Sequence, residues 1–109
     1  MLFNLFKRNK GYVDLSADKF REALITDSNF VVLDVRTSEE FKAGHIKDAR
    51  KADFLSGEFA AKVDTMDKEK TYYVYCRSGA RSAMACKQLT KAGFTKVFNL
   101  SGGYSSWLR

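Results

Sequence analysis

The sequence predicts an α/β fold in which a mainly parallel sheet is covered by helices on both faces. From Gly11 onward, short apolar runs alternate with segments whose apolar residues recur at helical spacing, which is the pattern of successive strand and helix units. The run from Phe30 to Val35 is apolar without alternation, as expected for a strand buried on both faces, and we place it at the centre of the sheet. Thr71 to Tyr75 is a second strong strand.

Each element is justified by a local signal. Ser16 is an N-cap, Thr37 and Glu40 have the spacing of a capping box, and glycines stand where helices end. Before Cys76 we expect a strand at Tyr12-Val13, a helix from Ser16 to Asp27-Ser28-Asn29, a helix at Ser38 to Lys42, an edge strand within Ile46 to Ala52, and a helix over Phe54 to Val63 broken by Gly57. After it we expect a helix ending at Gly93, a strand at Lys96 to Leu100, and a short helix after Gly102-Gly103.

Length and composition limit the classes of protein. At 109 residues the chain is the size of one domain, in which we treat 1–10 as a leader or packing arm and 11–109 as the domain. Two cysteines and one histidine cannot supply a standard four-ligand zinc site or a disulfide framework, so we expect no metal. The formal charge of +6 comes from scattered cations, so we expect no nucleic-acid partner.

The first residues and the free thiols indicate a compartment. The apolar opening of the chain is too short for a signal peptide or a membrane span, and its positive charge follows the apolar part. Free cysteines persist in reducing surroundings. We therefore expect a cytoplasmic protein without a membrane span. The sequence leaves its oligomeric state open.

The feature that carries chemistry is the segment Cys76 to Ser82, which we call the cysteine loop. A thiol stands where a strand should end, and the next residues bring two guanidinium groups, a glycine and two hydroxyls before a helix begins. Backbone N–H groups at such a turn converge on one point, and the charge of Arg77 and Arg81 favours thiolate over thiol. Cys76 is therefore the candidate nucleophile.

Two other residues offer Cys76 a partner. His45 is the only imidazole, and a cysteine-histidine mechanism would require it to reach Cys76. We favour a structural role for this ring in the turn after Gly44. Cys86 could act as a resolving thiol, but it lies about 9 Å along the helix from the loop, farther than disulfide geometry allows. We expect it to pack in the core.

Asp34 and Arg36 flank Val35 at the carboxyl end of a strand. Charged residues at this position either brace a loop or belong to the site. We favour bracing, with Glu39 and Glu40 as the near partners of Arg36.

Several motifs occur together in order: Leu33-Asp34-Val35-Arg36, Glu40-Phe41, Gly44-His45-Ile46, Cys76-Arg77-Ser78-Gly79-Ala80-Arg81-Ser82, and Leu100-Ser101-Gly102-Gly103 with Trp107. Over Val31 to Leu108 the chain resembles the single-domain rhodanese-like sulfurtransferases. The resemblance implies a three-layer α/β/α fold with a five-stranded, mainly parallel sheet, and Cys76 as the residue that carries sulfur. Lys47-Asp48 stand where the family usually has proline and glycine.

The reaction implied is transfer of a sulfane sulfur from thiosulfate or a small persulfide, through a Cys76 persulfide, to a thiol or cyanide acceptor, without a cofactor. Arg77, Ser78, Gly79, Ala80, Arg81 and Ser82 would bind the donor, while Asp34, Arg36 and His45 would support the site. A relay that exchanges sulfur with a protein partner, or a regulatory module, is the alternative. A cysteine phosphatase or arsenate reductase is a further one, but its arginine would follow the cysteine by six positions, whereas Arg81 follows by five.

Overall fold

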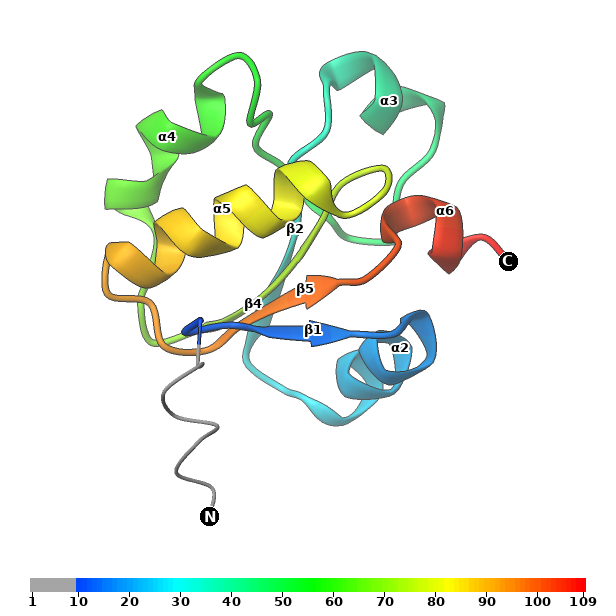
Figure 1. Cartoon of the computed structure of the whole chain (residues 1–109), viewed down its shortest axis with the longest axis horizontal. Coiled ribbons are helices and arrows are strands. Elements are labelled where there is room, and N and C mark those ends of the chain that lie inside the picture. The colour runs from blue at the N-terminus through cyan, green and yellow to red at the C-terminus, as the bar shows by residue number, and fades with distance from the viewer. Residues whose placement is uncertain (1–9) are drawn as a thin grey trace.

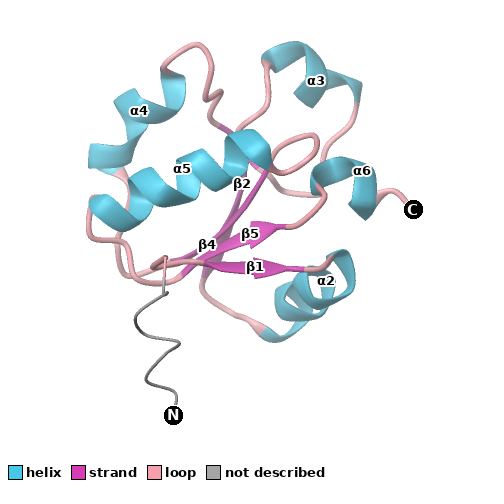
Figure 2. Cartoon of the chain, viewed as in Figure 1, coloured by secondary structure: helices cyan, strands magenta, loops and turns pink. Residues whose placement is uncertain are grey.

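The computed structural model describes residues 10–109, and alternating strands and helices make up that part of the chain (Figures 1 and 2). The strands are β1 (Val13–Leu15), β2 (Phe30–Asp34), β3 (Arg50–Lys51), β4 (Thr71–Tyr75) and β5 (Val97–Leu100). The helices are α2 (Ala17–Thr26), α3 (Ser38–Ala43), α4 (Glu58–Lys62), α5 (Ala80–Lys91) and α6 (Gly103–Trp107), with a 3₁₀ turn η1 (Val63–Thr65). The predicted leader lies almost wholly outside the described residues.

The five strands form one parallel sheet in the order β1-β5-β4-β2-β3. The middle strand is therefore β4, and the expectation that Phe30 to Val35 forms the centre was wrong. All five residues of β4 are buried, and both of its neighbours pair with it, so that Val74 lies between Leu33 and Asn99. Any internal strand of a parallel sheet can be apolar on both faces. The apolar character of β2 and β4 therefore does not tell which of them is the middle strand.

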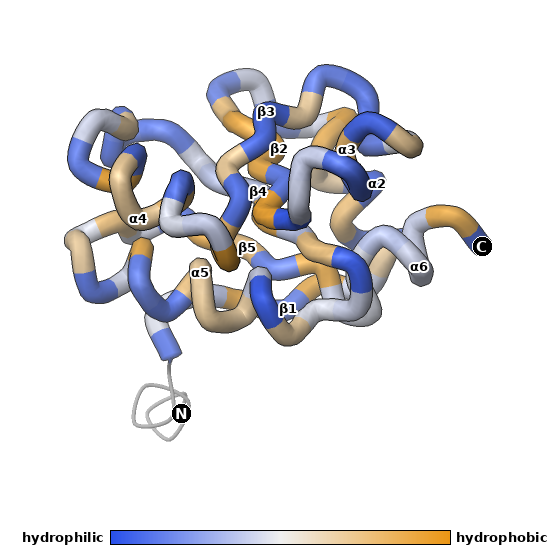
Figure 3. The backbone as a smooth tube through the Cα atoms, turned by 90° about the horizontal axis from the view of Figure 1, so that it is seen from above, coloured by the Kyte–Doolittle hydropathy of each residue, from blue (hydrophilic) through white to orange (hydrophobic). Residues whose placement is uncertain are grey.

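Helices cover both faces of the sheet, as Figure 1 shows for α4 and α5 on one side and α2 on the other. One core cluster joins Phe59 of α4 and Leu89 of α5 to one face of the sheet. A second cluster joins Phe20 of α2 and Trp107 of α6 to the other face. In Figure 3, apolar segments lie around β2 and β4 in the middle of the molecule, as expected for a buried parallel sheet.

The short polar signals define the helix ends. The Ser16 side chain accepts a hydrogen bond from the Lys19 amide at the start of α2. At α3 both halves of the capping box are present between Thr37 and Glu40. Gly57 has a φ of +91° and precedes α4, so it starts that helix instead of interrupting a longer one.

The segment Lys47-Asp48 keeps a tight turn without proline or glycine. The Ala49 amide donates to the Ile46 carbonyl at 3.0 Å, and Asp48 takes a left-handed φ of +65°. A positive φ at the third residue of a β-turn is usually supplied by glycine, and aspartate is one of the few other residues that tolerate it. The segment therefore closes as a hydrogen-bonded β-turn, with Asp48 at the position that glycine usually occupies.

Within residues 10–109, none of the helices combines the length and apolar character needed to cross a membrane.

Candidate functional site

The cysteine loop begins at the carboxyl end of the central strand, where ligands of open parallel sheets bind. Cys76 directly follows β4, and α5 begins at Ala80, after Gly79 in a left-handed conformation with a φ of +113°. The chain thus turns from strand to helix within four residues. This sharp turn encloses the Cys76 side chain, which is 1 % exposed.

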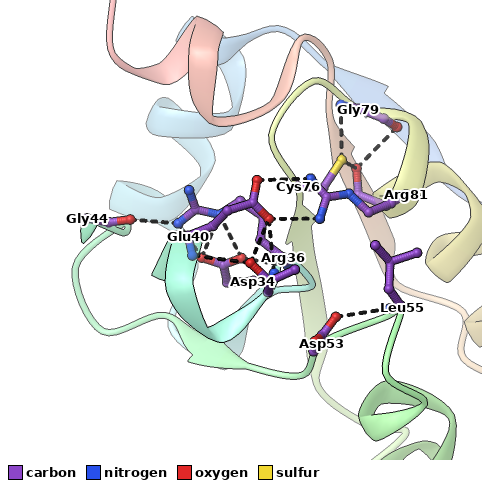
Figure 4. Close-up of polar contacts among 11 residues, drawn as sticks. Asp34, Arg36, Glu40, Gly44, Asp53, Leu55, Cys76, Gly79 and Arg81 are labelled. Carbon is purple, nitrogen blue, oxygen red and sulfur yellow. Dashed lines mark hydrogen bonds and ion pairs between the residues drawn. The ribbon is translucent and has the colours of Figure 1, made fainter. Parts of the chain in front are cut away.

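The Cys76 sulfur accepts hydrogen bonds from its own loop. The Gly79 amide lies 3.1 Å from Sγ and the Ser82 hydroxyl 3.3 Å from it, as Figure 4 shows for Gly79. The Ser82 oxygen is also 3.2 Å from the Gly79 carbonyl, so its single proton has two acceptors. Ser82 is itself fully buried. The sulfur is therefore held in a small set of donors that can stabilise negative charge.

These donors decide the charge state of the thiol. Burial acts to raise the pKa of Cys76. Hydrogen bonds from the Ser82 hydroxyl, and then from the backbone amides of Ser82, Gly79 and Ser78, outweigh burial, so the pKa lies below the ordinary 9.0. A cysteine with a lowered pKa is a competent nucleophile at neutral pH.

The Arg81 side chain extends to α3 and binds Glu40 (Figure 4). Its two terminal nitrogens lie 2.8 and 3.1 Å from the two Glu40 carboxylate oxygens. Glu40 is fixed in turn by the Thr37 amide at 3.0 Å. The Arg81 hydrogen bond holds the pKa of Glu40 at about 2, so the pair stays ionised at neutral pH. Sequence reasoning used Glu40 as a helix cap and missed its second role.

Arg77 lies in different surroundings. It is exposed and lines a hollow of about 300 Å³ beside α6, together with Tyr104, Ser105 and Leu108. Its side chain makes no ion pair with any residue of 10–109. Of the two arginines predicted to bind the donor, only Arg81 has a carboxylate partner within the part of the chain that the structure describes.

Asp34 and Arg36 form a buried ion pair at the carboxyl end of β2. The side chains are 0 % and 5 % exposed, and Arg36 Nη2 lies 2.7 Å from Asp34 and 2.6 Å from the Gly44 carbonyl. The expectation that Glu39 and Glu40 would be the partners of Arg36 was wrong. Residues two apart in extended chain point to the same side, so Asp34 is the nearer carboxylate.

The Arg36 guanidinium also lies over the Tyr104 ring, 4.4 Å from its centroid. This contact joins the end of β2 to α6. The hydrogen bond to the Gly44 carbonyl and the contact with Tyr104 are consistent with the structural, bracing role predicted for Arg36.

Within residues 10–109, neither His45 nor Cys86 forms a hydrogen bond with the Cys76 sulfur. The His45 ring stacks on Phe41 with centroids 3.7 Å apart, and its Nδ1 lies 2.8 Å from the Phe41 carbonyl. Cys86 is fully buried in the core, and this burial raises the pKa of its thiol. Both cysteines are free.

The amino end of α6 supports the cysteine loop, a feature that sequence reasoning missed. The amides of Tyr104 and Ser105 donate to the carbonyls of Cys76 at 2.8 Å and Arg77 at 3.1 Å. Gly103 has a φ of +62°, and a Cβ there would lie 2.4 Å from the Arg77 backbone. The adjacent glycines in the sequence were the available signal, because only glycine permits both the conformation and the close approach.

Comparison with known proteins gives one consistent result. The model of the rhodanese-like domain family matches residues 16–109. The chain is 36 % identical to the putative sulfurtransferase YtwF of Bacillus subtilis, covering 86 % of this chain and 88 % of that protein. It is 30 % identical to a sulfurtransferase of Allochromatium vinosum, covering 88 % of each. A crystal structure of a rhodanese-related protein from Thermoplasma volcanium has a TM-score of 0.78 at 29 % identity, covering 89 % of this chain and 91 % of that one.

Proposed function

This chain belongs to the rhodanese-like family of sulfurtransferases, and we propose that it transfers a sulfane sulfur through a persulfide on Cys76. The donor is thiosulfate or a low-molecular-weight persulfide, and the acceptor is a thiophile such as a thiol or cyanide. The observation that carries the proposal is the buried Cys76 sulfur, which accepts hydrogen bonds from the Gly79 amide and the Ser82 hydroxyl.

The reaction consists of two displacements. The Cys76 thiolate attacks the outer sulfur of the donor, the donor S–S bond breaks, and sulfite or a thiolate leaves with the bonding electron pair. An acceptor then attacks the outer sulfur of the Cys76 persulfide, and the Cys76 thiolate is released. No redox partner is needed, because the sulfur moves without net oxidation of the protein.

The loop supplies the two properties that these steps require. A lowered Cys76 pKa makes the thiolate available as both nucleophile and leaving group. The same donors stabilise the negative charge of the persulfide, which lies one sulfur farther from Cβ. Arg77 supplies the positive charge that attracts the donor.

The charge balance of the loop favours a persulfide donor, free or carried by a partner protein, over thiosulfate. Glu40 already neutralises Arg81, so one unpaired arginine faces a thiosulfate dianion. The reacting end of a persulfide carries less negative charge than the thiosulfate dianion. We expect a higher kcat/KM with glutathione persulfide than with thiosulfate, measured side by side with one acceptor. A large preference for thiosulfate would contradict this part of the proposal.

The central test is the variant Cys76→Ser. Thiosulfate-to-cyanide transfer should fall roughly 10³-fold or more, because serine cannot hold the transferred sulfur. Mass spectrometry should find one added sulfur on wild-type Cys76 after exposure to the donor.

Cys86→Ala is the matched control, since it removes the other thiol and should retain transfer. Undiminished transfer by Cys76→Ser would overturn the proposal. Cys76-dependent hydrolysis of a phenyl phosphate, without sulfur transfer, would favour a phosphatase.

A further inference from the structure

The hollow of about 300 Å³ beside α6 adjoins the cysteine loop, and we call it the α6 hollow. Its wall includes Arg77 of the loop and Tyr104 and Ser105 of α6. The amides of Tyr104 and Ser105 donate to the carbonyls of Cys76 and Arg77, so backbone hydrogen bonds join this wall to the residue that carries the thiol. Figure 1 shows α6 next to the turn between β4 and α5.

Three charged residues line the α6 hollow, and two of them already have partners. Arg36 binds Asp34, and Glu40 binds Arg81 (Figure 4). The third, Arg77, is exposed and forms neither an ion pair nor a side-chain hydrogen bond within residues 10–109. Among the described residues, the lining therefore has one net positive charge, which favours a ligand group with one negative charge.

The surface around Arg77 is open to solvent and partly polar. Ser105 is exposed, and its hydroxyl forms no hydrogen bond within the described part of the chain. Leu108 is 66 % exposed, so this part of the wall is also uncovered. A guanidinium binds the two oxygens of a carboxylate in parallel, and a hydroxyl can donate one further hydrogen bond to it. A carboxylate therefore matches these groups.

The second step of the proposed reaction needs a binding site for the acceptor close to Cys76. There the acceptor thiolate attacks the outer sulfur of the Cys76 persulfide, and the S–S bond of that persulfide breaks. The Cys76 thiolate leaves with the bonding electron pair, and the acceptor becomes a small persulfide. Arg77 directly follows Cys76, with its Cα about 3.8 Å from that of Cys76. It is thus placed to bind a carboxylate that lies a few bonds from the attacking sulfur.

Resting on the proposed function, we infer that Arg77 binds the carboxylate of a thiol acceptor and makes the protein prefer carboxylate-bearing thiols to neutral ones. The contact is made to a part of the acceptor that does not react, so Arg77 determines specificity. Arg36 and Arg81 would each have to give up a carboxylate partner to take this role.

The test isolates the second displacement. The protein is loaded with sulfur from glutathione persulfide, freed of donor, and mixed with 3-mercaptopropionate or with 3-mercaptopropanamide, which has nearly the same size but no charge. Mass spectrometry follows the loss of the added sulfur from Cys76. The ratio of the two rate constants is taken within each variant, so the different intrinsic reactivities of the two thiols cancel when variants are compared.

In Arg77→Gln this ratio should fall about fivefold, the loss expected for one exposed ion pair of good geometry. The rate with the carboxylate should fall, and the rate with the amide should stay at the wild-type value. Lys87→Gln is the matched control, because it removes the same charge from an exposed position of α5 that does not line the hollow. Its ratio should equal that of the wild type.

An equal ratio in the wild type and Arg77→Gln, or an equal fall in both variants, would overturn the inference. These outcomes require a loaded protein, so they differ from a failure of the proposed function, in which wild-type Cys76 would retain no sulfur at all.

A second measurement does not depend on loading. The probe is 3-(methylthio)propionate, which carries the carboxylate but has no thiol to react, and it is followed by amide NMR spectra of the isotope-labelled full chain. We expect saturable shifts at Arg77 and Ser105 in the wild type and their loss in Arg77→Gln. The absence of such shifts in the wild type would overturn the inference. The same spectra show that each variant is folded.

Discussion

The reactivity that we propose for Cys76 depends on hydrogen-bond donors that single residues supply. Among them the Ser82 hydroxyl contributes most to lowering the pKa of the thiol. In Ser82→Ala, burial remains and this donor is lost, so the pKa should rise. Transfer at neutral pH should fall about tenfold, the usual effect of one hydrogen bond to a charged group. The ultraviolet absorbance of the thiolate during a pH titration measures the change directly.

Ser78→Ala is the matched control in the same loop. Ser78 contributes through its backbone, which alanine keeps. Its titration midpoint should stay at the wild-type position. A midpoint unchanged in Ser82→Ala would show that the hydroxyl donates to the Gly79 carbonyl instead of to the sulfur.

At the scale of elements, the loop is held by the packing of α6 against it. Gly103→Ala would place a methyl group within 2.4 Å of the Arg77 backbone and retain a φ of +62°. We expect a loss of about 2 kcal/mol or more in the free energy of unfolding, with reduced sulfur transfer. Urea denaturation and steady-state transfer assays measure the two effects.

Gly57→Ala is the control for Gly103→Ala. It separates the steric clash of an added methyl group from the cost of placing alanine in a left-handed conformation. Gly57 also has a left-handed φ, of +91°, but a Cβ there meets nothing within 4 Å. This variant should lose about 1 kcal/mol and keep full transfer. Equal losses of stability and activity in the two variants would contradict a supporting role for α6.

At the scale of the whole molecule, two carboxylates join separate elements and make stability depend on acid. Glu40 binds Arg81 and Glu58 binds Lys51, and these contacts lower both carboxyl pKa values from 4.5 to about 2. A lowered carboxyl pKa stabilises the fold above the unfolded value, and this contribution is lost as pH falls toward the folded value. Stability should therefore decline between about pH 5 and 2, by about 1 kcal/mol for each pair after solvent screening.

Urea denaturation at several pH values measures this dependence. Glu40→Gln with Glu58→Gln should lower stability at neutral pH and flatten the decline in acid. Glu39→Gln with Glu69→Gln removes two glutamates that form no ion pair within residues 10–109 and should keep the wild-type profile. If the stability of the Glu40→Gln/Glu58→Gln variant fell with pH as steeply as that of the wild type, the acid sensitivity would come from other groups.

The sequence by itself predicted most elements and singled out the cysteine loop, because both depend on residues close together in the chain. The capping box of Thr37 and Glu40 and the burial of Cys86 follow from helical spacing. The cysteine loop could also be identified from the sequence, since its hydrogen-bond donors lie within six residues of Cys76.

Only the tertiary structure decided how these parts meet. It placed β4 and not β2 at the centre of the sheet, and it bound Arg81 to Glu40, 41 positions away. It also brought Gly103 against the backbone of Arg77. These contacts join residues far apart in sequence, so they depend on strand order and helix packing, which local propensity does not encode.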